Sequence, residues 1–184
     1  VGKLLIQGLH KMEYRGYDSA GIALHQKDSI FNLRTLGKVS LLEDEMIEKR
    51  PKSKLGIAHT RWATHGKPSK KNAHPHESGE VNIVHNGIIE NYLELKEKLI
   101  QAGYTFESET DSEVIAHLLH QHFQSKGDLL EAMHEAIKEL DGAFAIAAIH
   151  IKDKNRLVVA RNKSPLLIGA VSYTHLRAHE TPRH

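Results

Sequence analysis

The sequence predicts a layered α+β domain in which helices pack outside paired sheets. Segments with strand-like alternation come first, two segments with helical periodicity follow in the middle, and strand-like segments return near the end. This order of strands, helices and strands is typical of α+β architecture. Internal repeats and low-complexity linkers are absent from the sequence, so we expect one domain.

Periodicity assigns the elements of the first half of the chain. Val1, Leu5, Leu9 and Met12 recur at intervals of three to four, which is the apolar stripe of a helix that begins at or before the first residue. Alternation of small and apolar residues indicates strands in the segments that follow. After the first helix we expect strands at 19–25 and 30–36, a short helix at 41–47 and a buried strand at 55–60.

The second half begins with a loop rich in Thr, Gly, His and Pro, which ends near residue 79. Leu95 and Leu99 share one face of an amphipathic helix that starts near Glu90, and Gly103 supplies its stop signal. The run 143–149 is apolar throughout, as expected of a strand buried on both faces. The other expected elements are strands at 81–85, 104–107, 156–161 and 166–169 and helices at 112–124 and 128–140.

Composition excludes several classes of protein. With 184 residues, 40% hydrophobic and 26% charged, the chain has the balance of a globular domain. The formal charge of +2 comes from basic residues interspersed with acids, which argues against a nucleic-acid surface. No apolar run reaches the roughly 18 residues that a bilayer span needs, and residues 1–11 are unlike a signal peptide. We therefore expect no membrane association and a cytoplasmic location.

Fifteen histidines raise the alternative of a metal site, because imidazole is a common metal ligand. The candidates His59, His65, His74, His76 and His85 lack the i, i+4 spacing of a helical metal pair, and no regular pattern of carboxylates accompanies them. The chain has no cysteine, which also excludes thiolate sites and disulfides. We therefore expect hydrogen-bonded histidines and no metal.

Four segments carry more polar, loop-forming residues than a scaffold requires. Each falls at a strand end or in a loop, where functional groups are usually displayed. They are Tyr-Arg-Gly-Tyr-Asp-Ser-Ala-Gly at 14–21, His-Thr-Arg-Trp-Ala-Thr-His-Gly at 59–66, Val-His-Asn-Gly-Ile-Ile-Glu-Asn at 84–91 and Ser-Glu-Thr-Asp-Ser-Glu at 108–113. A further motif, Asn-Ala-His-Pro-His, lies between them at 72–76. On spacing alone, each segment supports only a weak functional hypothesis.

In this order, the motifs closely resemble the amino-terminal, glutamine-hydrolysing domain of glucosamine-6-phosphate synthases, the glutamine–fructose-6-phosphate aminotransferases. The resemblance covers residues 1–170, whereas residues 171–184 do not match and look like a foreign tail. It implies the fold of an N-terminal-nucleophile hydrolase, a four-layer αββα sandwich, here truncated at the N-terminus. The element order given above agrees with that fold.

The resemblance implies that Arg61 and Asp111 bind the two charges of a glutamine substrate. A planar guanidinium suits the α-carboxylate because both oxygens can accept from it, and the carboxylate of Asp111 takes the α-ammonium. Such a pair discriminates a zwitterionic amino acid from a bare amide. Without the surrounding motifs, a surface salt bridge for Arg61 and a helix cap for Asp111 are the simpler interpretations.

Asn86 and Gly87 resemble the oxyanion hole of the family. A side-chain amide and a backbone N–H would stabilise the oxygen that becomes negative when the carboxamide is attacked. The alternative is a two-residue Asn-Gly hairpin turn. The residues after Gly87 do not mirror the strand before Asn86, which disfavours that turn.

Trp62, Thr64, His65 and Gly66 resemble the loop that closes over bound glutamine in the family. In that family the tryptophan stands between the glutamine pocket and the route taken by ammonia. Closure of such a loop keeps water away from the reaction. The resemblance therefore assigns these four residues to substrate binding.

The family's nucleophile is an N-terminal cysteine in the start Cys-Gly-Ile-Val-Gly. Its thiolate attacks the amide, and its own α-amino group, with a pKa of about 8, acts as base. Arg15 and Tyr17 match the block that supports this end of the pocket, although an arginine between two tyrosines also suits a stacked structural role. Because the chain has no cysteine, we expect the fragment itself to be inactive.

By resemblance, the complete parent makes glucosamine 6-phosphate from L-glutamine and D-fructose 6-phosphate without a metal or an organic cofactor. The partner of this domain is then the C-terminal sugar-phosphate isomerase domain of the parent chain, through which the parent forms a homodimer. Two alternatives stay open. One is another class II amidotransferase, such as one that acts on phosphoribosyl pyrophosphate, and the other is a cysteine-less module that binds glutamine for regulation.

Overall fold

The computed structural model describes residues 1–62 and 67–169. Its helices are α1 Gly2–Met12, α2 Val39–Lys49, α3 Tyr92–Gln101, α4 Glu113–Lys126 and α5 Leu129–Glu139, with a 3-10 turn η1 at Glu13–Arg15. Its strands are β1 Ser19–His25, β2 Ile30–Leu36, β3 Leu55–Arg61, β4 His76–Ser78, β5 Val81–Ile89, β6 Gly142–His150 and β7 Val158–Asn162. Across these ranges, no helix combines the length and the apolar character that crossing a membrane requires.

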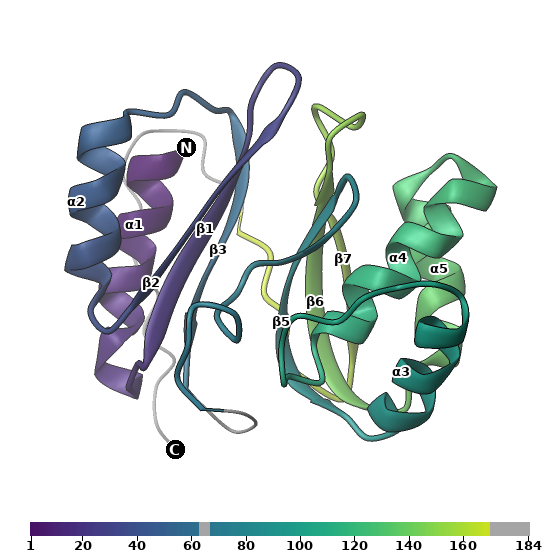
Figure 1. Cartoon of the computed structure of the whole chain (residues 1–184). Coiled ribbons are helices and arrows are strands. Elements are labelled where there is room, and N and C mark those ends of the chain that lie inside the picture. Colours follow the sequence, from purple (N-terminus) through teal and green to yellow (C-terminus); the bar gives the residue numbers. More distant parts are fainter. Residues whose placement is uncertain (63–66, 170–184) are drawn as a thin grey trace.

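The strands form two sheets that face each other (Figure 1). One sheet has the order β2-β1-β3 and the other the order β4-β5-β6-β7, and neighbouring strands are antiparallel in both. Helices α1 and α2 cover the outer face of the first sheet, and α3, α4 and α5 cover that of the second (Figure 1). The layers run helices, sheet, sheet, helices, which confirms the predicted α+β fold with helices outside paired sheets.

The first outer layer is held by the apolar stripe of α1. Ile6 and Leu9 are buried against β1, the central strand of its sheet. Val1 and Met12, the two ends of the predicted stripe, are 40% and 42% exposed. The helix is therefore where the periodicity placed it, but its buried face is centred on the three-residue step from Ile6 to Leu9.

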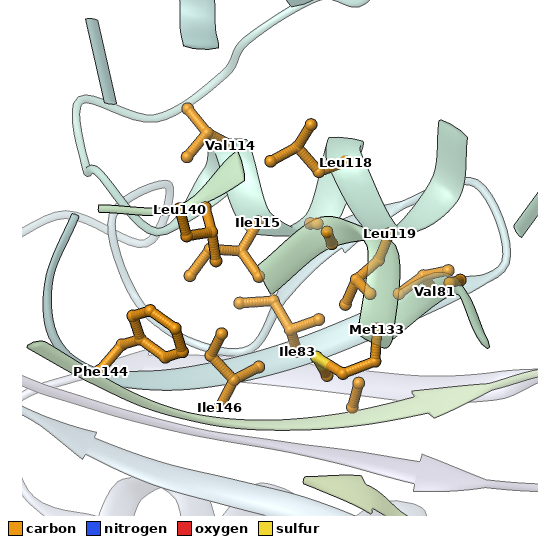
Figure 2. Packing of buried hydrophobic residues seen from close by; sticks show 14 of the residues in the cluster. Val81, Ile83, Val114, Ile115, Leu118, Leu119, Met133, Leu140, Phe144 and Ile146 are labelled. Atoms are coloured by element: carbon orange, nitrogen blue, oxygen red, sulfur yellow. The ribbon is translucent and has the colours of Figure 1, made fainter. Parts of the chain in front are cut away.

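The larger core lies between the second sheet and its helices, and Figure 2 shows its packing. Ile115 and Leu119 of α4, four residues apart on one helix face, pack with Met133 of α5 against Ile83 of β5 and Ile146 of β6. Each of these side chains is at most 2% exposed. Full burial of one such side chain contributes roughly 1.5–3 kcal/mol, so this cluster is a main source of stability for the second half of the chain.

The two sheets contact each other through small and aliphatic residues. Ala23 of β1 lies opposite Ile57 of β3, and both pack with Ile149 of β6. At the same end of the molecule, the His25 side chain is hydrogen-bonded through Nε2 to the carbonyl oxygen of Ile151, at 2.8 Å. These contacts fix the distance between the sheets.

Farther along β1, a loop segment inserts between the sheets. The backbone of His74 lies against Gly21, and a Cβ at Gly21 would be only 2.0 Å from the His74 carbonyl oxygen. Only glycine permits so close an approach. His59 of β3 lies directly opposite Gly21, and its ring centroid is 4.2 Å from that of His74. The inserted loop thus lies beside the strand that carries the second motif.

The predicted strand at 104–107 is wrong, because the backbone there has a different partner. The N–H groups of Glu107 and Ser108 donate to the carboxylate of Glu113 at 2.9 and 2.7 Å. Burial, the largest influence, would raise the pKa of Glu113, but hydrogen bonds from His117 and from residues 107 and 108 together lower it to about 2. A charged side chain therefore takes the donors that a neighbouring strand would otherwise use.

Other elements also differ from the predictions. Residues 166–169 are not a strand, and Leu167 is 92% exposed. The sequence does not predict strand β4, because its three residues include no Val, Ile, Thr, Tyr, Phe or Trp. The strand pairs with the start of β5 through a turn at Gly79, where φ is +55°. Strand β5 continues to Ile89 instead of stopping at residue 85, and this extension places residues 84–89 of the third motif inside a strand.

Candidate functional site

A cavity of about 410 Å³ lies where β3 and β5 approach each other from opposite sheets. Five of the predicted site residues line it: Arg61, Trp62, Asn86, Gly87 and Asp111. They come from the end of β3, the interior of β5 and the turn that precedes α4. Three motifs that are far apart in the sequence therefore meet at one cavity.

Arg61 is the last residue of β3 and is 5% exposed. Its Nη1 lies 3.5 Å from Oδ1 of Asp18, which precedes β1. The Ser19 hydroxyl donates to the same Asp18 oxygen at 2.7 Å, and the Asp18 N–H donates to the carbonyl oxygen of Arg61 at 2.8 Å. The alternative of a surface salt bridge is wrong, because the side chains of Arg61 and Asp18 are only 6% and 15% exposed and their backbones are hydrogen-bonded to each other.

Asp111 is 5% exposed and lies before α4. Its Oδ2 accepts a hydrogen bond from the backbone N–H of Ile89 at 2.8 Å. The N-cap position of α4 belongs to Ser112. The helix-cap interpretation of Asp111 is therefore wrong, since the carboxylate binds the end of β5 instead of the helix.

Asn86 and Gly87 lie inside β5, paired with Ala145 and Phe144 of β6. The hairpin interpretation is therefore wrong. At Gly87 φ is +129°, and a Cβ would be 1.9 Å from the carbonyl oxygen of Ala143. The position accepts only glycine because both the backbone conformation and the space exclude a side chain.

Strand geometry indicates the direction of the Gly87 N–H. The N–H of Glu90 points toward β6, since it donates to the carbonyl oxygen of Asp141, whereas the N–H of Ile89 points to Asp111. Backbone N–H groups two residues apart in a strand point the same way. We therefore expect the Gly87 N–H on the same edge as that of Ile89, the edge where Asp111 lies.

Three histidines in the cavity wall were not assigned a role from the sequence: His59, His74 and His85. The Nε2 of His59 lies 2.8 Å from Oδ1 of Asn86, and His85 Nδ1 is hydrogen-bonded to the Ser112 hydroxyl at 2.8 Å. Burial lowers the pKa of all three, and that of His85 to about 4. The signal available in the sequence was alternation, because His59 and Arg61 are two apart and must share one face of a strand.

Trp62 follows β3 and is 65% exposed. Its ring covers Gly16, where a Cβ would be 1.5 Å from the indole and where φ is +97°. The contact joins the second motif to the first at the rim of the cavity.

The remaining predicted site residues are placed only in part. Thr64, His65 and Gly66 lie outside the described residues, as does the side chain of Arg15, whose backbone ends η1. Tyr17 is partly buried and does not line the cavity. In the part of the chain that the structure describes, no three His, Cys, Asp or Glu side chains are grouped so that they could hold a metal ion.

The chain matches the family model of the glutamine amidotransferase domain over residues 59–177, and it belongs to this family. Within it, the chain is 50% identical over 169 residues to the glutamine–fructose-6-phosphate aminotransferase [isomerizing] of Acinetobacter baylyi and 53% identical over 171 residues to that of Legionella pneumophila strain Paris. Each match covers 92% of this chain and 28% of the relative. The resemblance predicted from the motifs is confirmed, and the chain spans little more than a quarter of the length of these relatives.

Solved structures show the same fold. The glutamine phosphoribosylpyrophosphate amidotransferase from B. subtilis matches 85% of this chain and 34% of its own, with a TM-score of 0.71 and 26% identity. An allosteric regulatory enzyme of purine biosynthesis matches 87% of this chain and 34% of its own, with a TM-score of 0.74 and 26% identity. A class-II glutamine aminotransferase domain protein from Silicibacter pomeroyi, at 19% identity and a TM-score of 0.58 over 82% of this chain and 71% of its own, shares the fold alone.

Proposed function

We propose that L-glutamine binds in this cavity and that the chain is the glutamine-hydrolysing domain of a glutamine–fructose-6-phosphate aminotransferase. The observation that carries the proposal is the meeting of a buried cation, Arg61, and a buried anion, Asp111, in the cavity that also holds Asn86 and Gly87. Relatives with 50–53% identity support this choice of reaction. The domain would comprise residues 1–170.

The two charges suit the α-carbon end of glutamine. The guanidinium of Arg61 is held by Asp18, and its planar fork of donors matches a carboxylate. The carboxylate of Asp111 is oriented by the Ile89 N–H and would accept from the α-ammonium. A ligand that lacks either charge would lose one charge-assisted contact with a buried group, and so should bind more weakly than glutamine.

The carboxamide end would then lie at Asn86 and Gly87. The N–H groups of Gly87 and Ile89 are two residues apart, roughly 6.5 Å along a strand, which is close to the length of a glutamine side chain. Attack on the carboxamide converts its carbonyl oxygen into an oxyanion, which the Asn86 amide and the Gly87 N–H would stabilise as preorganised donors. Trp62 and, by resemblance, Thr64, His65 and Gly66 would close the pocket against water.

The nucleophile implied by the family is a cysteine, and the 184 residues contain none. We therefore propose that the chain as printed binds glutamine without hydrolysing it. In the parent, Arg15 and Tyr17 would support the cysteine, ammonia would pass to the sugar-phosphate isomerase domain, and a homodimer would form through that domain. No metal or organic cofactor enters this chemistry.

One observation favours a second candidate function. A pocket with the two substrate charges and no cysteine also suits a glutamine-binding regulatory module. Both candidates predict glutamine binding, but only the glutaminase gains turnover when a cysteine-led segment is supplied.

The binding proposal is tested by titration calorimetry of the 184-residue chain with L-glutamine and two truncated ligands. Glutaramic acid lacks the α-ammonium, and 4-aminobutanamide lacks the α-carboxylate. We expect Arg61→Ala to weaken L-glutamine binding about a hundredfold, because a buried, charge-assisted contact is typically worth a few kcal/mol. The same variant should bind 4-aminobutanamide as tightly as the unsubstituted 184-residue chain does, since this ligand already lacks the carboxylate that Arg61 recognises.

Asp111→Ala is the reciprocal arm of this test. It should weaken L-glutamine binding by a similar factor and leave glutaramic acid binding unchanged. Lys98→Ala is the matched control, because Lys98 is exposed on α3 and pairs only with Glu94 of the same helix among the described residues. Equal losses for all three ligands in either variant would indicate a structural defect and contradict the assigned roles.

A further inference from the structure

His59 and Asn86 come from opposite sheets and meet in the cavity. His59 lies on β3, in register with Gly21 of β1, and Asn86 lies on β5. The Nε2 of His59 is 2.8 Å from Oδ1 of Asn86. This is a direct side-chain hydrogen bond between the two sheets at the place where the carboxamide of glutamine is proposed to lie.

The chemistry of the amide gives this contact a direction. Oδ1 of an asparagine only accepts hydrogen bonds, and Nδ2 only donates. His59 must therefore be the donor, through an Nε2–H. With Oδ1 held by His59, the Nδ2 group lies on the opposite branch of the planar amide and points away from the imidazole. If the amide rotated by half a turn, it would present an acceptor to the oxyanion, and the repulsion between them would destabilise the transition state.

We propose that His59 is a positioning residue, which holds the Asn86 amide so that Nδ2 faces the reacting carbonyl oxygen of the substrate. The inference rests on the proposed function of the cavity, since it assigns to His59 the orientation of a group that matters only if an oxyanion forms there. His59 makes no contact with substrate in this proposal.

The surroundings of His59 favour the required tautomer. Burial has the largest effect on the pKa of His59 and lowers it, as does the positive charge of Arg61. The hydrogen bond to Asn86, the charge of Asp18 and a backbone hydrogen bond with His85 raise it. The net decrease keeps the imidazole neutral near pH 7, with one N–H. Nε2 of His59 lies 2.8 Å from Oδ1 of Asn86, an atom that only accepts, whereas Nδ1 has no such short contact within residues 1–62 and 67–169. The single proton therefore belongs on Nε2, where Asn86 accepts it.

A purely structural role predicts a different outcome. If His59 only ties the two sheets together, its loss lowers the free energy of unfolding, but every functional property of a folded variant stays the same. A positioning role changes the orientation of one amide, and hence kcat, with little effect on glutamine binding. The conservative variant separates the two cases, because the Nε2 of glutamine can occupy nearly the place of the histidine Nε2 and still donate.

The first experiment uses the chain as it stands. Nitrogen-15 spectra of the histidine rings should show a protonated Nε2 and an unprotonated Nδ1 for His59. Addition of L-glutamine should shift the side-chain NH₂ resonance of Asn86 in the unsubstituted 184-residue chain and in His59→Gln, but not in His59→Phe. His134→Phe is the control, because His134 is exposed on α5. This variant should give the same spectra as the unsubstituted chain.

The second experiment measures turnover in a chimera in which the family's cysteine-led N-terminal segment precedes Val1. His59→Phe should lower kcat about tenfold to a hundredfold, since misplacement of one oxyanion donor costs less than its removal. KM for glutamine should change less than threefold. His59→Gln should keep most of the kcat of the chimera. When Asn86 is already replaced by alanine, His59→Phe should not lower kcat further.

The outcomes separate this inference from the function on which it rests. No binding of L-glutamine by the chain would overturn both. Binding with the Asn86 resonance shifted equally in His59→Phe would overturn the positioning role alone, as would additive losses in the double variant. If His59→Phe does not fold, two measurements still test the proposal. An Nδ1–H tautomer of His59 in the unsubstituted chain would contradict it, and so would a kcat of His59→Gln as low as that of Asn86→Ala.

Discussion

At the scale of single residues, the site depends on which side chains share a strand face. His59 and Arg61 alternate with Ala58 and Thr60 on β3, so both lie on the face with Ile57, which packs between the sheets. There the Nε2 of His59 lies 2.8 Å from Oδ1 of Asn86. Each of these groups is fixed by a neighbour before any ligand is present. Such preorganisation is what lets a hydrogen-bond donor stabilise a transition state without first reorienting.

Asn86→Ala should lower kcat much more than it raises KM for glutamine. The amide is proposed to act on the oxyanion, which exists in the transition state and not in the bound substrate. Removal of one such donor costs about a hundredfold to a thousandfold in kcat. Steady-state kinetics of ammonia release by the cysteine-led chimera would measure both constants.

The matched control for this prediction is Asn155→Ala, because Asn155 is an exposed asparagine in a turn before β7. It should leave both constants unchanged. A rise in KM at constant kcat in Asn86→Ala would identify Asn86 as a binding residue instead of an oxyanion donor.

The motifs predicted much of the site, and its supporting contacts were harder to predict. Arg61, Asp111, Asn86 and Gly87 follow from the motif blocks, and the structure brings all four to one cavity. The contact between Arg61 and Asp18 joins residues 43 positions apart, which no local pattern encodes. Such contacts depend on the pairing of β1 with β3, and that pairing follows only from the tertiary fold.

At the scale of elements, glycines set how closely segments approach. Gly21→Ala should destabilise the chain by about 2–4 kcal/mol, because the new methyl group would lie 2.0 Å from the His74 carbonyl oxygen and the backbone between two packed sheets has little room to move. Urea unfolding of the parent chain and the variant measures the difference.

Gly8→Ala is the control for that prediction. Gly8 lies in α1, and a Cβ there would meet nothing within 4 Å. Alanine should raise the free energy of unfolding by up to about 1 kcal/mol through helix propensity. If both substitutions changed the free energy of unfolding in the same direction, close packing of His74 on Gly21 would not explain the effect of Gly21→Ala.

Elements with strong periodicity were predicted almost to the residue, whereas those that depend on distant partners were not. The first two predicted strands coincide with β1 and β2, since alternation and flanking turns are local signals. The strand predicted at 104–107 fails because Glu113 captures its backbone donors. Asn86 and Gly87 extend β5 against sequence preference because β6 runs beside the whole strand.

At the scale of the whole molecule, buried histidines should make stability depend on pH. Burial lowers the pKa of His76 to about 3 and that of His85 to about 4, against about 6.5 when unfolded. Both are neutral in either state above pH 6.5. As the pH falls from 6.5 to about 4, only the unfolded chain takes up these protons, so the free energy of unfolding should fall by up to about 1.4 kcal/mol per pH unit for each histidine.

Urea unfolding at pH 7 and pH 5 tests this dependence. In His76→Gln the loss of stability between the two pH values should be smaller by about 2 kcal/mol, since one proton uptake has been removed. His134→Gln should leave the dependence unchanged, because His134 is exposed on α5. The lowered pKa of Glu113, about 2, stabilises the folded chain fully above pH 4.5, and this contribution is lost as the pH falls from about 4.5 to about 2. It therefore does not change between pH 7 and pH 5.

The chain itself should not turn over glutamine. The 184 residues should release no ammonia from glutamine, because they contain no cysteine and the family chemistry needs a thiolate and an α-amino group on one residue at the edge of the pocket. The N-terminus of Val1 cannot substitute, since it donates to the carbonyl oxygen of Ser53 at 3.0 Å and does not line the cavity. Fusion of the cysteine-led segment to Val1 should restore hydrolysis, and the same segment led by alanine should not.

Ammonia release is measured for all three purified forms, after circular dichroism has shown that each is folded. Ammonia release above the blank by the 184-residue chain or by the alanine-led chimera would contradict the cysteine mechanism. A folded cysteine-led chimera that binds L-glutamine but releases no ammonia would favour the regulatory module instead. The glutaminase and the regulatory module would both use Arg61 and Asp111 to bind glutamine. They differ at the carboxamide end of the pocket, where only the glutaminase needs Asn86 and Gly87 to face a nucleophile.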